Sequence, residues 1–305
     1  MAAGVQVARL DPALGVRIVA TRELRYTTPA AAADDRPAHV RAASGLVHAG
    51  GRLVVIQDDA AFVATVAADE VAAIALPRGA GGRRRFELAC GNKHEKLDLE
   101  SCVAVDGALW AFGSGSTPAR EHVAVIDDRP RTIGAAPLYR RIRDYLGAIN
   151  LEGAAAVGDE LWLFHRGNTG PADRGPAVIR FARGAVAGWL HGRAALPEVI
   201  GTQSFDLGAI GSVRFGFTDA VVVGARVYFL GVAEDSPDAI ADGQVLGARL
   251  GVIAGDGVRV ADVGAFKAEG LAFDPADARR AWIVIDPDDV AAPAQLCELE
   301  LQGPW

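Results

Sequence analysis

Three glutamates recur along the chain, each followed by a small residue and then by an apolar run, at Glu100, Glu152 and Glu269. Two further copies of the pattern begin with a hydroxyl residue instead, at Ser44 and Thr218. Carboxylates that converge on one point repel one another and are costly to bury in ionised form. A hard divalent cation would relieve this repulsion, and oxygen-only ligands favour calcium, with magnesium as the second choice. We expect four acids to hold the cation: Glu100, Glu152, Asp219 and Glu269.

Basic residues and histidines stand close to these acids in the sequence. A cation would polarise a scissile group or activate water, and a histidine could act as general base near neutral pH. Lysine and arginine would hold the negative charge of a small anionic ligand. The candidate catalytic residues are His94, His165 and Arg166. The candidate ligand-binding residues are Lys93, Lys96, Arg41 and Lys267.

Both groups of charged residues also have a purely structural explanation. The acids could cap backbone N–H groups or pair with an arginine of a neighbouring repeat. The basic residues could form salt bridges that balance these acids at a solvated rim. The sequence alone leaves these alternatives open.

The segments around the charged residues predict the fold. Each copy continues through a reverse turn into a second strand with an aromatic near its start, and most copies extend to about four strands. A β repeat of this length predicts an all-β, five-bladed β-propeller in a single domain spanning residues 1–305, because each blade presents an equivalent corner to one axis. The blades begin near residues 44, 100, 152, 218 and 269.

The fifth copy supplies only three strands, ending in the strand that contains Cys297. We expect the strand at 16–26 to complete this last blade and close the ring, which would remove an exposed sheet edge. In the third copy we expect the fourth strand at 185–190. Three insertions remain: residues 78–98, a helical turn at 137–147, and residues 192–215.

Composition excludes several classes of protein. The formal net charge is −7, so the chain lacks the basic character of a general nucleic-acid binder. No run of 18 apolar residues predicts a membrane span. The first residues lack a basic segment followed by an apolar one, so we expect no signal peptide. Three cysteines without metal-site spacing (Cys90, Cys102 and Cys297) indicate a reducing compartment, and we expect a cytoplasmic location.

The blade starts DLES, NLEGAAAVGDELWLFHRGN and KAEGLAFD resemble those of phytase-like and esterase-like bacterial β-propeller proteins. They are similar also to uncharacterised bacterial propeller families and to calcium propellers of the lactonase type. The resemblance implies a propeller with a cation at the mouth of its central channel, and it implies no substrate. Ser44 and Thr218 depart from the pattern, because an acid is expected at those two corners.

Together these observations predict a metal-dependent hydrolase, with calcium at the channel mouth, that acts on a small anionic ester such as a phosphomonoester or a lactone. The alternative is a non-catalytic propeller that binds a small anionic ligand or a protein partner and carries a structural cation.

Overall fold

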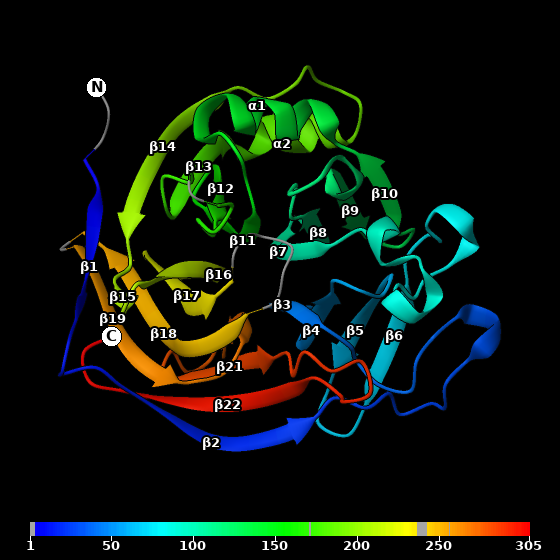
Figure 1. Cartoon of the computed structure of the whole chain (residues 1–305), viewed down its shortest axis with the longest axis horizontal. Helices are drawn as coiled ribbons and strands as arrows, with labels where there is room; N and C mark the ends of the chain where they lie inside the picture. Colours follow the sequence, from blue (N-terminus) through cyan, green and yellow to red (C-terminus); the bar gives the residue numbers. More distant parts are fainter. Residues whose placement is uncertain (1–3, 171, 237–242, 256) are drawn as a thin grey trace.

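The computed structural model describes residues 4–170, 172–236, 243–255 and 257–305. Most of these residues lie in β-strands, and the strands form four hydrogen-bonded sheets. The sheets are arranged around a central axis, and the chain passes round this axis once, from the blue strands through green and yellow to red (Figure 1). This radial arrangement brings the starts of strands that are distant in the sequence close to one axis.

Three of the sheets contain four antiparallel strands each. The first comprises β3 (Ala43–Ala49), β4 (Arg52–Gln57), β5 (Phe62–Val66) and β6 (Val71–Ala75). The second comprises β7 (Leu99–Val105), β8 (Ala108–Gly113), β9 (His122–Ile126) and β10 (Arg131–Gly134). The third comprises β20 (Ala268–Phe273), β21 (Arg280–Ile285), β22 (Gln295–Gln302) and β2 (Gly15–Glu23).

The fourth sheet has ten strands and departs from the expected separate blades. It contains the antiparallel strands β11 (Leu151–Val157), β12 (Glu160–His165), β13 (Ala177–Ala182) and β14 (Val199–Asp206). It also contains β15 (Ala209–Ile210), β16 (Val213–Val223), β17 (Arg226–Asp235), β18 (Gln244–Ala254) and β19 (Gly257–Gly264). Strand β1 (Gln6–Leu10) joins the two groups, because it pairs in parallel with both β14 and β19.

The N-terminal region also supplies β2, which runs along the outer side of β22 (Figure 1). The two strands pair antiparallel, and Thr21 lies opposite Cys297. The pairing expected between the N-terminal strand and the strand containing Cys297 is therefore present, with β2 at Gly15–Glu23 rather than at 16–26.

The expectations for the third repeat and the insertions need one correction. Residues 185–190 were expected to form a strand, but they lie in the helix α2 (Arg183–Leu190). This apolar run buries Val186 and Leu190, four residues apart, which is the spacing of one helical face. The fourth strand of this group is β14, which lies within the predicted insertion 192–215. The predicted helix near 137–147 is present as α1 (Ala136–Leu146).

The hydrophobic core consists of five clusters among the described residues. Each cluster lies between two neighbouring groups of four strands, and together they follow the ring. One cluster packs β20–β22 against β3–β5, so the last group of strands contacts the first. The cluster between β7–β9 and β11–β13 also buries the apolar faces of α1 and α2.

Short 3-10 helices fill the connections: Ala32–Asp34, Ala80–Gly82, Leu88–Cys90, Lys93–Glu95 and Pro118–Arg120. Three of these lie in the predicted insertion 78–98, directly before β7. Among the described residues, no helix combines the length and the apolar character needed to cross a membrane.

Candidate functional site

The repeated corner residue lies at a β-bulge in each of the five innermost strands. The pairing register shifts by one residue in β3, β7, β11, β16 and β20, and each shift skips the corner position. A bulge leaves one residue without a partner in the ladder and can direct its side chain towards a site. The skipped residues are Ser44, Glu100, Glu152, Thr218 and Glu269.

The two hydroxyl corners connect neighbouring strands. Ser44 donates to the carbonyl oxygen of Leu99 at 2.5 Å, and Thr218 donates to that of Ala268 at 2.6 Å. Each acceptor is the residue directly before an acid corner. Ser44 and Thr218 therefore hold the backbone that carries Glu100 and Glu269, which is a physical reason for a hydroxyl at these positions.

The three acid corners line a cavity of about 940 Å³. Glu152 accepts a hydrogen bond from Asn150 at 2.6 Å and lies 3.4 Å from Arg166. Glu269 is 3% exposed, and neither of its carboxylate oxygens has a hydrogen-bond partner among the described residues. Glu100 is half-buried at the cavity wall. All three glutamates thus line the same cavity.

The environment disfavours the ionised form of all three glutamates. Burial raises the pKa of Glu100 well above its usual value, and the carboxylates of Asp98 and Asp58 raise it further. Burial likewise raises the pKa of Glu269, although Arg166 opposes this effect. The pKa of Glu152 is raised by burial and lowered in part by Arg166. The acids would gain from a cation that enters the cavity.

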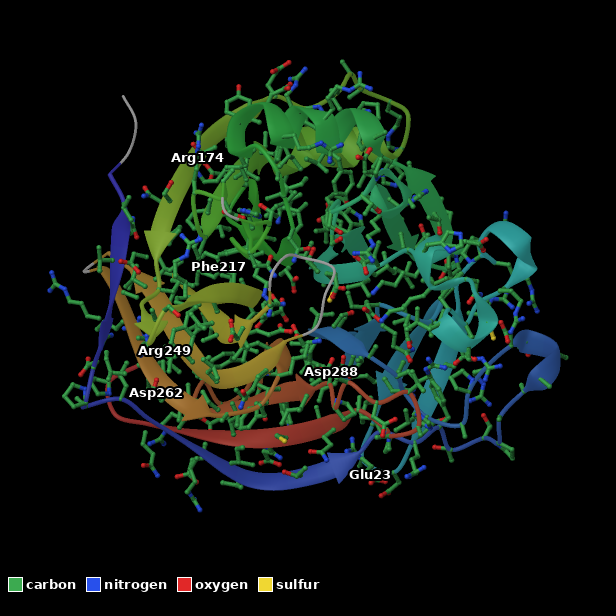
Figure 2. The ribbon with its side chains drawn as sticks, viewed as in Figure 1. Glu23, Arg174, Phe217, Arg249, Asp262 and Asp288 are labelled. Atoms are coloured by element: carbon green, nitrogen blue, oxygen red, sulfur yellow. The ribbon has the colours of Figure 1, made fainter. Side chains whose placement is uncertain are left out.

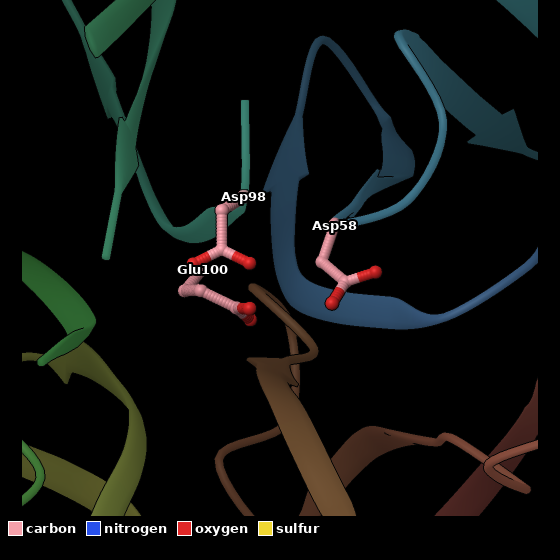
Figure 3. Close-up of side chains that lie close together, drawn as sticks. All are labelled: Asp58, Asp98 and Glu100. Carbon is pink, nitrogen blue, oxygen red and sulfur yellow. The ribbon is translucent and has the colours of Figure 1, made fainter. Parts of the chain in front are cut away.

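A second group of acids adjoins Glu100. One carboxylate oxygen from each of Asp58, Asp98 and Glu100 lies within 4.8 Å of the others, and Figure 3 shows the three side chains around a common space. The ammonium group of Lys96 lies 2.5 Å from an oxygen of Asp58 and 2.5 Å from one of Asp98. Arg120 lies 3.1 Å from Asp98. Lysine and arginine therefore already neutralise much of this group.

Sequence reasoning did not assign Asp98 to the site. Its backbone has a φ of 54°, a left-handed conformation that is uncommon outside glycine. Ala42 and Asp288, which also line the cavity, have positive φ values of 39° and 52°. Such strain often marks functional positions. The spacing of Asp98 two residues before Glu100 was the available signal in the sequence.

The buried basic residues of the cavity are engaged in ion pairs. Arg166 lies between Glu152, at 3.4 Å, and Glu234, at 2.5 Å. Lys267 lies 2.6 Å from Asp288 and 3.9 Å from Asp286. Lys267, Asp286 and Asp288 all line the cavity, and Asp288 lies towards the centre of the ring in Figure 2, whereas Glu23 is peripheral.

Two predicted basic residues lie at the cavity wall on a short 3-10 helix, namely Lys93 and His94. The side chain of His94 is 77% exposed, and its Nε2 atom lies 3.9 Å from Glu95. His94 therefore occupies the outer rim and Lys93 is half-buried, while Glu152, Glu269 and Arg166 are buried.

Three predicted site residues are not among the described residues that line the cavity: Asp219, His165 and Arg41. Asp219 accepts hydrogen bonds from the backbone N–H groups of Leu271, at 2.7 Å, and Leu46, at 3.4 Å. The Asp219 carboxylate therefore connects β16 to β20 and β3. The residue after the corner is glycine in three other copies, and Asp219 places a hydrogen-bond acceptor at the same position.

His165 and Arg41 contact residues that line the cavity, although they are not in the lining themselves. The Nδ1 atom of His165 accepts from the N–H of Asn150 at 3.0 Å, and its Nε2 atom lies 3.3 Å from Asp173. Arg41 lies 2.6 Å from Asp59 and 2.9 Å from Glu87. Their ring or guanidinium atoms are thus engaged by neighbours that hold the loops in place.

Two further carboxyl groups at the cavity have a raised pKa. Burial raises the pKa of Asp286 to about 7, with Lys267 opposing the change and Asp288 adding to it. Burial and the carboxylate of Asp58 raise the pKa of Asp59 to about 6, while Arg41 opposes the change. A group with a pKa near 7 is suited to proton transfer at neutral pH. The backbone N–H of Asp286 donates to the carbonyl oxygen of Lys267 at 3.2 Å, which places Asp286 opposite Lys267, two residues before Glu269.

Acids predominate at the cavity surface. Among the described residues, its lining contains eleven aspartates or glutamates and five lysines or arginines. The site therefore has the electrostatic character of a cation-binding site.

Comparison with known proteins bears on the fold. Glutaminyl cyclase from Myxococcus xanthus superposes with a TM-score of 0.51 at 12% identity, over 98% of each chain. The gluconolactonase XC5397 from Xanthomonas campestris gives a TM-score of 0.42 at 14% identity, over 85% of this chain and 70% of that one. The WD40 domain of Neurospora crassa Pan2 gives 0.41 at 9% identity, over 96% and 97%. The similarity to the glutaminyl cyclase supports a propeller-like β fold.

A search of curated protein sequences gave no match. One family profile, described as "Family of unknown function (DUF6929)", matches residues 39–301, which is most of the chain. The protein therefore belongs to the family of unknown function DUF6929.

Proposed function

We propose that this protein is a five-bladed β-propeller hydrolase that holds a calcium ion at its corner glutamates and cleaves a small ester or lactone in the central cavity. The observation that carries this proposal is Glu269, a buried carboxylate in the cavity lining whose two oxygens have no hydrogen-bond partner in the part of the chain that the structure describes. A buried acid without a partner is costly, and a bound cation would offset that cost.

The residues fit a hard divalent cation. Glu100, Glu152 and Glu269 lie on three of the innermost strands, β7, β11 and β20, and offer only oxygen ligands, which suits calcium. The group formed by Asp58, Asp98 and Glu100 is the alternative cation site. Among the described residues it is the set of three acids with oxygens within 4.8 Å of one another, but the ammonium of Lys96 already lies between its two aspartates. When bound, the cation would polarise the carbonyl of the ester.

The chain's own residues would orient the substrate and move the proton. Asp286, with a pKa of about 7, would accept a proton from the attacking water. Glu234 and Glu152 hold Arg166 in a fixed position, from which its guanidinium would orient the ester. His165 would act indirectly, because it fixes the backbone at Asn150.

The charge of the cavity favours a neutral substrate over the anionic one expected from the sequence. Lys96, Arg120, Arg166 and Lys267 each have a carboxylate partner in the cavity wall. A phosphomonoester would have to compete with these carboxylates for the basic residues. A neutral ester or lactone would avoid that competition.

Five blades account best for the arrangement of the sheets. The ten-stranded sheet contains two groups of four antiparallel strands, and only the parallel strand β1 joins them. The five core clusters each lie between neighbouring groups. We therefore assign the third and fourth blades to β11–β14 and β16–β19.

Calcium titration of the wild type and of Glu269→Gln tests the cation site. A ligand at a hundred times its Kd stabilises the native state by about 2.7 kcal/mol. We expect calcium to raise the Tm of the wild type by several degrees and EDTA to reverse the change. The Glu269→Gln protein without calcium should unfold at the same or a higher temperature, because a neutral amide replaces a buried acid, and calcium should no longer raise its Tm.

Glu70→Gln is the matched control, since Glu70 is exposed and its nearest ion-pair distance, to Arg52, is 3.5 Å. It should retain the calcium response. An equal response in wild type and Glu269→Gln would contradict the cation site. Calcium binding without turnover of any ester or lactone would instead identify a binding propeller with a structural cation.

A further inference from the structure

Two large apolar side chains are exposed at the wall of the cavity. Leu88 is 80% exposed and Val290 is 59% exposed, and both belong to the lining. Single exposed apolar residues are common on protein surfaces and need no explanation. Two exposed apolar residues at one cavity with a mainly charged lining do need an explanation.

The two residues lie on the same flank of the cavity. The loop that carries Val290 contacts the chain before β3, because the N–H of Ala294 donates to Val40 at 2.9 Å. The next residue, Arg41, binds Glu87 at 2.9 Å, and Glu87 directly precedes Leu88. The remaining apolar residues of the lining belong to the same segments: Ala42, Ala43, Phe86 and Ala89.

The other flank of the cavity is polar. The strand ends and loops of β11–β12 and β16–β17 contribute Asn150, Arg166, Asn168, Glu234 and Ser236 to the lining. Glu269 and Glu100 come from the sheets on either side of β3, whereas Glu152 lies on β11 and belongs to the polar flank.

We infer that the cavity selects a ligand with an apolar alkyl or aryl group attached to its polar reacting part. The polar part faces Glu269 and Arg166, and the apolar group lies against Leu88 and Val290. The ester as the polar reacting part rests on the proposed function. The contact between the apolar group and Leu88 and Val290 does not depend on it. It assigns Leu88 and Val290 as specificity-determining residues.

Hydrolysis of p-nitrophenyl acetate, butyrate and hexanoate in calcium tests the selection. Each methylene that leaves water is worth about 0.8 kcal/mol, or roughly fourfold, and a partly open wall would give less. We expect kcat/KM to rise by roughly tenfold from acetate to hexanoate. In the double variant Leu88→Ser with Val290→Ser this ratio should fall to about one. Val7→Ser is the control, because Val7 is 57% exposed on β1 and is not in the lining.

Binding of the neutral fluorophore N-phenyl-1-naphthylamine tests the apolar contact without turnover. We expect the wild type and Val7→Ser to bind it with equal Kd and the double variant to bind at least fivefold more weakly. If no ester is cleaved but this difference appears, the hydrolase proposal fails and the apolar wall stands. Equal Kd values in wild type and double variant, or no binding to the wild type, would overturn the inference whether or not esters are cleaved.

Discussion

Glu269 is one of several carboxyl groups in the cavity lining that have a raised pKa. Burial raises the pKa of Glu100, Glu152 and Glu269, and it raises that of Asp286 to about 7. Carboxyl groups of this kind favour the protonated form in the folded protein but ionise near their usual pKa when the chain unfolds. The folded state therefore binds more protons than the unfolded state between about pH 4 and pH 7.

This difference predicts how stability depends on pH. The stabilisation by these acids is fully present below the unfolded pKa and is lost as pH rises through the folded value. We expect the calcium-free protein to have a free energy of unfolding about 2 kcal/mol higher at pH 5.5 than at pH 8, measured by urea denaturation. Asp286→Asn should reduce the dependence, and calcium should diminish it by stabilising the ionised forms. A stability that rises steadily from pH 5.5 to pH 8 without calcium would contradict this account.

The inner strands explain why the repeat has its particular composition. A Cβ atom added to Gly270 would lie 2.6 Å from the backbone nitrogen of Leu46, so only glycine fits beside the neighbouring strand. Gly153 approaches the backbone of Ala220 similarly, at 3.1 Å. The glycine after the corner in β20 and β11 thus reflects close packing of the inner strands, while the bulge positions the corner itself.

Thr218 provides a test of how one strand supports the next. Thr218→Val removes the hydrogen bond to Ala268 and leaves a buried carbonyl without that donor. We expect a loss of about 1–2 kcal/mol in the free energy of unfolding and a several-fold weaker calcium affinity, because the backbone before Glu269 loses its support. Calorimetric titration and urea denaturation measure the two effects. Thr218→Ser, which retains the hydroxyl, should restore most of both, and a valine variant with unchanged calcium affinity would refute the supporting role.

At the scale of the whole molecule, the N-terminal segment completes two structures. Strand β2 covers the edge of β22, and β1 joins β14 to β19. An uncovered strand edge is a site for intermolecular pairing. The two roles can be separated, because β1 precedes β2 in the chain and makes no contribution to the pairing with β22.

Two truncations distinguish these roles. Removal of residues 1–26 takes away β1, β2 and the buried Leu24, and we expect it to give aggregated protein. Removal of residues 1–10 takes away β1 alone, and we expect soluble protein with a lowered Tm. Size-exclusion chromatography and thermal denaturation measure both outcomes. A soluble 27–305 protein with the Tm of the full chain would show that β2 is not needed to close the ring.

The sequence by itself determined the repeat and the corner positions, because the same β-bulge recurs at the start of each innermost strand. It also indicated β2, since the last copy lacked a strand. Helix α2 and strand β14 were misassigned because an apolar run such as 185–190 has no period that distinguishes the two structures. Only the tertiary structure decided that Lys96 neutralises Asp58 and Asp98, that Asp219 binds backbone amides, and that Leu88 and Val290 share one wall. These relations depend on distances between residues far apart in the chain, and such distances are set by how the sheets pack around the axis.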